Sequence, residues 1–132
     1  MRSRLVAIAG VILLTVTGCQ SAPAASSAPA SAPVELSADA QAGKQLFVSK
    51  GCVACHRAPN VPEAQGSIGP NLRGVGNASS HPKIAGVIDN NPENMKRWLM
   101  NPPTLKPGTA MPSLGLSDDE AARLTAFLET LK

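Results

Sequence analysis

Aromatic side chains are almost absent from this sequence of 132 residues, which has two phenylalanines, one tryptophan and no tyrosine. Aromatic residues usually supply much of the buried surface of a small core. The sequence also has no large excess of charge of one sign. Without Arg2 and Arg4 the net charge falls from +3 to +1, because ten basic residues then stand against nine acidic ones. This balance gives no indication of nucleic-acid binding. A small domain built from this chain therefore needs core volume from something besides its own side chains.

The first eighteen residues are typical of a bacterial export signal. Arg2 and Arg4 form a basic start, and the apolar run from Leu5 to Val16 is too short for a membrane-spanning helix of a mature protein. The next residues, VTGC, resemble the lipobox of bacterial lipoproteins and predict lipid on Cys19. Diacylation would supply the two chains that stable anchoring requires. An ordinary secretory signal with an incidental cysteine is the alternative interpretation.

Residues 19–36 are nearly all Ala, Ser and Pro, a composition that cannot bury enough apolar surface to fold. We predict a lipid-anchored tether with a reach of about 20 to 25 Å. It would hold one folded domain, residues 37–132, beside a bacterial membrane. The expected location is extracytoplasmic, in the periplasm or on the outer face of the cell membrane.

Cysteine occurs three times, and two of the three stand in the sequence Cys52-Val-Ala-Cys55-His56. A structural zinc site needs four Cys or His ligands, and the only other histidine is His81. A thioredoxin-like dithiol needs a strand and helix context that the flanking sequence lacks. The order Cys-x-x-Cys-His is the attachment signature of c-type haem. Two sulfurs three residues apart reach the two vinyl groups on one porphyrin edge, and the histidine is carried beneath the iron. We predict one covalent haem, which would also supply the missing core volume.

The second axial ligand of this haem has four candidates, which are Met95, Met100, Met111 and His81. Met111 lies in LKPGTAMPSLG, a loop stiffened by proline in which a side chain can point away from regular structure. Met95 and Met100 fall in a predicted helix, where methionine more often packs in the core. His81 lies in SSHPK, a predicted exposed turn. The sequence favours Met111.

Three helices are predicted, and no strand-like alternation of useful length appears. The first has Ser37 as N-cap and ends near Gly51, the second begins at Asn91 and ends before Pro102, and the last begins at the capping box of Ser117. A glycine in mid-helix, Gly43, indicates a close crossing by another helix, for which the last helix is the expected partner. The long stretch from Ala58 to Asn90, rich in Gly, Pro and Asn, suits loops that wrap a cofactor. The predicted fold is all-α.

These motifs together resemble a class I cytochrome c over about residues 38–132: GCVACH, IGPNL at 68–72, a middle helix with Trp98, Met111 before Pro112, and a carboxy-terminal helix. The resemblance is closest to the cytochrome c domain fused to subunit II of some bacterial haem–copper oxidases. Here a lipobox and a tether stand where a copper domain would be. The resemblance implies the class I cytochrome c fold, in which the first and last helices cross and loops wrap one covalent haem c.

The resemblance also implies roles for individual residues. It implies thioethers at Cys52 and Cys55, axial ligation by His56 and Met111, and a hydrogen bond from the proximal imidazole to the carbonyl of Pro70. Gly43 and Phe47 match the positions that contact the last helix, there Leu124 and Phe127. Trp98 either donates its indole N–H to a haem propionate or packs against the porphyrin.

With both axial positions filled, the iron has no open site for a substrate, so an electron-transfer protein is expected rather than an enzyme. The predicted function is a membrane-tethered respiratory shuttle, with a quinol–cytochrome c reductase as donor and a terminal oxidase as acceptor, both from the resemblance. The alternatives are a bound haem subunit of a membrane redox complex, or a sensor or peroxidase if Met111 leaves the iron. Six basic residues would form either a docking face for an acidic partner or scattered surface charge; they are Lys44, Lys50, Lys83, Lys96, Arg97 and Lys106.

Overall fold

The structure is a computed structural model that describes residues 35–132. The predicted signal peptide (1–18), the predicted lipid site Cys19 and nearly all of the predicted tether (19–36) lie outside the described residues. Within residues 35–132, no helix combines the length and the apolar character needed to cross a membrane.

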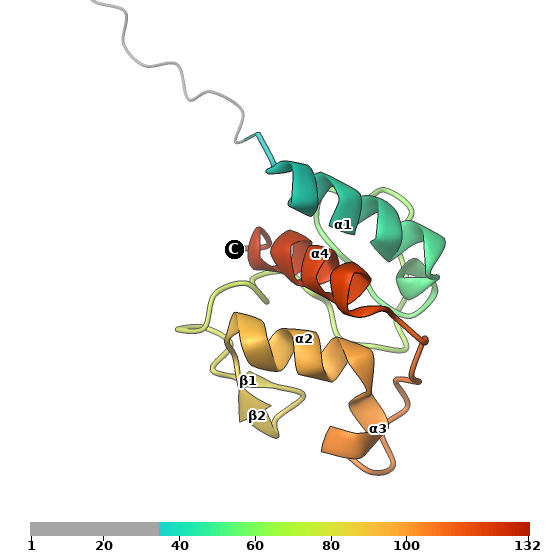
Figure 1. Cartoon of the computed structure of the whole chain (residues 1–132), viewed down its shortest axis with the longest axis vertical. Coiled ribbons are helices and arrows are strands. Elements are labelled where there is room, and N and C mark those ends of the chain that lie inside the picture. The colour runs from blue at the N-terminus through green and yellow to red at the C-terminus, as the bar shows by residue number, and fades with distance from the viewer. Residues whose placement is uncertain (1–34) are drawn as a thin grey trace, which may run out of the picture. The chain divides into compact units, whose positions relative to one another are not determined.

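Four α-helices form the described domain (Figure 1). They are α1 (Ala38–Ser49), α2 (Pro92–Met100), α3 (Pro102–Leu105) and α4 (Asp118–Glu129), with one 3-10 turn at Cys52–Ala54. One antiparallel pair of two-residue strands, β1 (Lys83–Ile84) and β2 (Ile88–Asp89), is the only sheet in residues 35–132. Four helices and so little strand confirm the predicted all-α fold.

The predicted helix starts are confirmed by their capping bonds. Ser37 Oγ accepts a hydrogen bond from the Ala40 N–H, and Asn91 caps α2 in the same way through the Asn94 N–H. At α4 the capping box is complete, because Ser117 Oγ accepts from Glu120 N–H while the Glu120 carboxylate accepts from Ser117 N–H. Gly51, at φ +79°, ends the first helical segment in the left-handed region that glycine adopts without strain.

Helices α1 and α4 cross at Gly43, as the mid-helix glycine predicts. A Cβ at position 43 would overlap the Arg123 carbonyl oxygen and lie 2.9 Å from the Phe127 Cβ. The rings of Phe47 and Phe127 meet beside this crossing, with centroids 5.6 Å apart and planes tilted by 58°. Only glycine lets the two backbones come this close, so the crossing fixes the first and last helices of the domain against each other.

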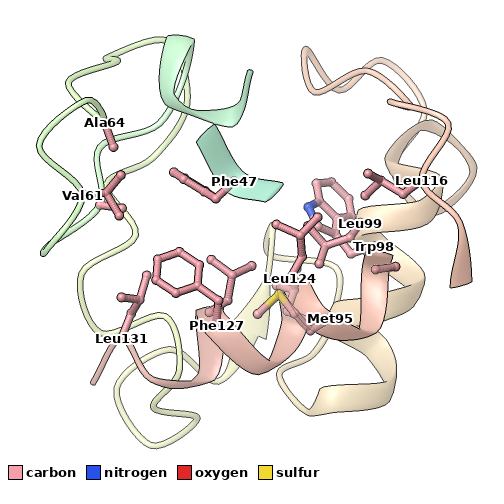
Figure 2. Close-up of a cluster of buried hydrophobic side chains, with 14 residues drawn as sticks. Phe47, Val61, Ala64, Met95, Trp98, Leu99, Leu116, Leu124, Phe127 and Leu131 are labelled. Atoms are coloured by element: carbon pink, nitrogen blue, oxygen red, sulfur yellow. The ribbon is translucent and has the colours of Figure 1, made fainter. Parts of the chain in front are cut away.

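Helix α2 packs on the same α4, and the three helices share one apolar core (Figure 2). Met95, Trp98 and Leu99 are the buried residues of α2, and Leu124, Phe127 and Leu128 are among those of α4. Met95 is 3 % exposed, which agrees with its predicted place in the core. The three helices thus form a packed frame for the loops between them.

Two elements were not predicted from the sequence. The first is the β1–β2 pair, where Ala85 (φ +51°) and Gly86 (φ +77°) make a tight turn between Ile84 and its partner Ile88. Strands of two residues are too short to show an alternating pattern. The second is α3, a single turn that begins directly after α2 because Pro102 is suited to the first position of a helix.

Candidate functional site

A cavity of about 560 Å³ opens among α1, α2, α4 and the loops that join them. Its volume is in the range of cofactor pockets. All six residues predicted to bind the cofactor line it, namely Cys52, Cys55, His56, Pro70, Trp98 and Met111. Much of the rest of the wall is apolar, from residues of the core such as Phe47, Met95, Leu99, Leu124 and Leu128. The structure therefore gathers residues from 47 to 128 around one space.

The segment with both cysteines is a short turn on one side of this cavity. The N–H groups of Cys55 and His56 both donate to the Cys52 carbonyl, at 3.2 and 2.9 Å, which closes the 3-10 turn. Within residues 35–132 neither Cys52 nor Cys55 takes part in a disulfide, so each sulfur is available for another bond. Burial raises the pKa of the Cys52 thiol above its ordinary value, and the neighbouring Cys55 adds to this effect, so the Cys52 thiol is protonated at neutral pH.

The imidazole of His56 has a fixed orientation. Its Nδ1 lies 2.9 Å from the carbonyl oxygen of Pro70. Since a carbonyl oxygen only accepts hydrogen bonds, Nδ1 carries a proton, and in the neutral imidazole the lone pair of Nε2 is then free to bind a metal. The imidazole ring fits only because residue 69 is a glycine: a Cβ there would lie 2.5 Å from His56 Cε1 and 2.7 Å from Nδ1. The arrangement is that of a histidine metal ligand oriented by a backbone carbonyl.

Met111 reaches the cavity from a segment without regular structure. Its N–H donates to Thr109 Oγ1 at 3.3 Å, and Gly108, at φ +79°, turns the chain just before. The Met111 side chain is partly buried and packs against the apolar core. Met95 and His81 also line the cavity, whereas Met100 does not. His81 is exposed, as predicted, and directly follows the turn at residues 78–80, with Nδ1 3.2 Å from Ser80 Oγ.

Trp98 is 7 % exposed and contributes to both the core and the cavity wall. Figure 2 shows its indole ring above α4, beside Leu99 and Leu116. No group within residues 35–132 accepts a hydrogen bond from its indole N–H. Both interpretations of Trp98, a propionate donor and a packing surface, stay open.

The donor set and the shape of the cavity fit a covalently held haem. Two unbonded thiols stand beside a histidine whose Nε2 is free, a methionine thioether lies in the same cavity, and apolar side chains supply walls for a flat ring. No group of three or more His, Cys, Asp or Glu that would hold a bare metal ion occurs in the described part of the chain. A haem bound here would be held by Cys52 and Cys55 through thioethers and by His56 at the iron, and it would supply one-electron redox chemistry.

One part of the wall was not predicted from the sequence. Lys83, Ile84, Ala85 and Gly86 of the hairpin line the cavity together with Lys106, whose Nζ donates to the Ala85 carbonyl at 2.9 Å. The sequence signal for this turn is Gly86 between the apolar residues Ile84 and Ile88. It was weak because many loops contain it.

The six basic residues considered as a docking face differ in their partners. Lys50, Lys83 and Lys96 form ion pairs with Glu120, Asp89 and Asp118, at 2.7, 2.6 and 2.6 Å. The docking-face interpretation is weakened, because half of its positive charges are matched within the domain. Apolar side chains are exposed at the cavity instead: Ile68 is 76 % exposed and Leu114 36 %.

The helical frame, the Cys-x-x-Cys-His turn and the cavity together define a c-type haem protein. The family model for cytochrome c matches residues 40–132, and the chain belongs to the cytochrome c family. This family binds covalently attached haem c, so haem c is the cofactor of the domain.

Three curated relatives are informative. The chain is 39 % identical over 97 residues to cytochrome c oxidase subunit 2 of Bacillus subtilis, covering 70 % of this chain and 26 % of that protein. It is 34 % identical over 104 residues to the same subunit of Bacillus sp. strain PS3, covering 76 % and 28 %. It is 32 % identical over 109 residues to cytochrome c-type cyt cy of Rhodobacter capsulatus, covering 75 % and 52 %. The chain thus spans about a quarter of the oxidase subunits and about half of cyt cy. No solved structure was found to match it.

The family and the likeness to cyt cy indicate an electron-transfer haem protein. They agree with the expectation of a carrier rather than an enzyme.

Proposed function

We propose that the chain is a monohaem cytochrome c that carries single electrons between membrane redox proteins. In this proposal Cys52 and Cys55 form the thioethers, and His56 and Met111 are the axial ligands. The observation that carries it is the gathering of all four residues on one apolar cavity, with the His56 Nδ1 engaged by Pro70 so that Nε2 is free. With two protein ligands on the iron, no position is open for a substrate, and electron exchange is the remaining chemistry.

The pair of axial ligands influences the reduction potential of the haem. A thioether stabilises ferrous iron relative to a second imidazole, so the potential should lie above that of a bis-histidine haem. The haem edge beside Cys52 and Cys55 would be the site of electron exchange, because both residues are only partly buried.

Absorption spectra test the ligands directly. The soluble domain, residues 37–132, would be produced with cytochrome c maturation machinery, with Met111→Ala as the variant. We expect a covalent low-spin haem with a sulfur-to-iron charge-transfer band that disappears in the variant, and no uptake of carbon monoxide by the native protein. A high-spin native haem, or ready uptake of carbon monoxide, would instead support the sensor or peroxidase alternative.

The acceptor we propose is a terminal oxidase, with a quinol–cytochrome c reductase as donor. The match to a quarter of cytochrome c oxidase subunit 2 supports this choice, because it places a related domain within an oxidase. The test uses Bacillus subtilis cytochrome c oxidase from which the matching quarter of subunit 2 has been deleted. Added reduced protein should restore oxygen uptake. If it does not, the oxidase is the wrong acceptor while the carrier function stands. Stoichiometric copurification with an oxidase in detergent would favour a bound subunit over a shuttle.

The location we propose is the outer surface of a bacterial cell membrane or the periplasm, with lipid on Cys19 and residues 20–36 as the tether. The lipobox-like VTGC supports this proposal. Mass spectrometry of the protein isolated from membranes should show a diacylated Cys19 as the first residue. The Cys19→Ser variant should be released into the soluble fraction, and a variant that stays with the membrane would contradict the anchor.

A further inference from the structure

The segment that carries Met111 is held to the helical frame by very few polar contacts. Residues 110–116 take part in no backbone–backbone hydrogen bond. The Met111 N–H bonds locally to Thr109 Oγ1. The one hydrogen bond from residues 110–116 to another element within the described part of the chain runs from Ser113 Oγ to the Met100 carbonyl, at 3.0 Å. This bond stands two residues after the proposed ligand.

The Met100 carbonyl is a suitable anchor because it belongs to the end of α2. The last carbonyls of a helix have no partner within it. Met100 is followed by Asn101 and then by Pro102 and Pro103, and prolines have no N–H to donate. The Thr104 N–H is donated to Asn101 instead. The Ser113 hydroxyl therefore supplies a donor that the backbone lacks, and it joins the loop to a helix whose Met95, Trp98 and Leu99 are buried.

Ser113 itself does not touch the cofactor space. Its neighbours Pro112 and Leu114 line the cavity, whereas Ser113 is exposed and does not. Any influence of its hydroxyl on the iron must pass through the backbone of the loop. This separates a role in positioning from direct contact.

We propose that Ser113 is a positioning residue that holds Met111 on the haem iron through its bond to Met100. The inference rests on the proposed function, since it requires Met111 to be the second axial ligand. Without the hydroxyl, the loop loses its hydrogen bond to α2, and Met111 leaves the iron more often. A neutral hydrogen bond of this kind changes such an equilibrium about twofold to tenfold.

The test compares the native haem-loaded domain with Ser113→Ala, Ser113→Thr and the control Ser49→Ala. Ser49 is a matched control because its hydroxyl also donates to a backbone carbonyl, that of Leu46, at an exposed position in α1 outside the cavity wall. The first readout is the rate at which carbon monoxide binds the reduced iron after rapid mixing. The second is the intensity of the sulfur-to-iron band on warming, and the third is the reduction potential.

We expect Ser113→Ala to bind carbon monoxide about twofold to tenfold faster, to lose the band at a lower temperature and to have a lower potential. Ser113→Thr, which keeps a hydroxyl, and Ser49→Ala should behave like the native protein. Equal behaviour of Ser113→Ala and Ser49→Ala, whether both change or neither does, would overturn the inference. A native protein that binds carbon monoxide at once would contradict the proposed function and this inference with it. A native protein that resists the gas, together with an unchanged Ser113→Ala, would contradict the inference alone.

Discussion

The imidazole Nδ1 of His56 lies 2.9 Å from the carbonyl oxygen of Pro70, and the glycine just before that proline makes the contact possible. A side chain at Gly69 would meet the imidazole ring itself. Orientation of the histidine therefore depends on a position that has no functional group of its own. Hydrogen bonding to Nδ1 makes the other ring nitrogen a stronger donor to a metal.

Gly69→Ala should displace the His56 ring. The added Cβ would lie 2.5 Å from Cε1, so the ring or the loop must shift, at a cost of about 1 to 3 kcal/mol in the free energy of unfolding. We expect a changed haem spectrum and a lower yield of low-spin protein. Gly76→Ala is the control, because its Cβ would meet the backbone of Glu129 and Leu128, away from the histidine. It should lower stability yet leave the spectrum unchanged, and a spectral change of equal size there would contradict the prediction.

Gly43→Ala should separate the first and last helices. Its Cβ would overlap the Arg123 carbonyl, and backbone atoms cannot move aside as a side chain can. A loss of at least about 1 to 3 kcal/mol in the free energy of unfolding is expected from denaturant titration of the haem-loaded domain. Gln45→Ala, two positions along on an exposed site of the same helix, should change it by less than about 0.5 kcal/mol. Comparable losses in the two variants would mean that the crossing is not the cause.

Acid should weaken the contact between α1 and the start of α4. The Lys50 ammonium lies 2.7 Å from the Glu120 carboxylate, and this bond, with the Ser117 N–H, lowers the Glu120 pKa below its ordinary value of 4.5. A lowered folded-state pKa gives stability that is present above pH 4.5 and is lost as the pH falls through the folded value. Glu120→Gln should therefore be less stable than the native domain near neutrality, and the difference should shrink below pH 4.5. A difference that is constant with pH would contradict this assignment; chemical denaturation at several pH values measures it.

Freeing Lys83 should change the charge at the cavity, whereas freeing Lys96 should not. Asp89→Asn releases Lys83, which lines the cavity, and Asp118→Asn releases Lys96, which does not. Both variants gain the same net charge. With ferricyanide as an anionic oxidant at low salt, Asp89→Asn should react about twofold faster than Asp118→Asn, and the gap should close at high salt as the charges are screened. Equal rates at low salt would show that electrons leave elsewhere.

The features readable from the sequence are those set by a few neighbouring residues. Ser37, Asn91 and Ser117 cap their helices as predicted, because a cap depends on three or four consecutive residues. Gly43 was informative for a different reason: glycine inside a helix costs stability, so its presence indicates that another part of the chain packs too closely for a side chain. The six predicted cofactor residues, from Cys52 to Met111, share one cavity, although their bonds to haem stay predictions.

Contacts between side chains that are far apart in the sequence could not be predicted. The ion pair of Lys50 with Glu120 joins the end of the first helix to the last helix, and no residue next to either one in the sequence indicates it. The bond from Ser113 to Met100 has the same character. The hairpin at Lys83 was missed because each strand has only two residues. Such features depend on how the chain packs in three dimensions, and local sequence patterns carry no information about that packing.

The crossing at Gly43 also bears on the order in which the domain folds. Its partner, Arg123, lies near the end of the described chain, so the core between α1 and α4 closes only after nearly the whole domain has been synthesised. Contacts so far apart in sequence are slow to form, because the entropy of closing the intervening loop must be overcome first. Throughout that interval the final core does not enclose Cys52 and Cys55, and their thiols are accessible to the enzymes that attach a cofactor.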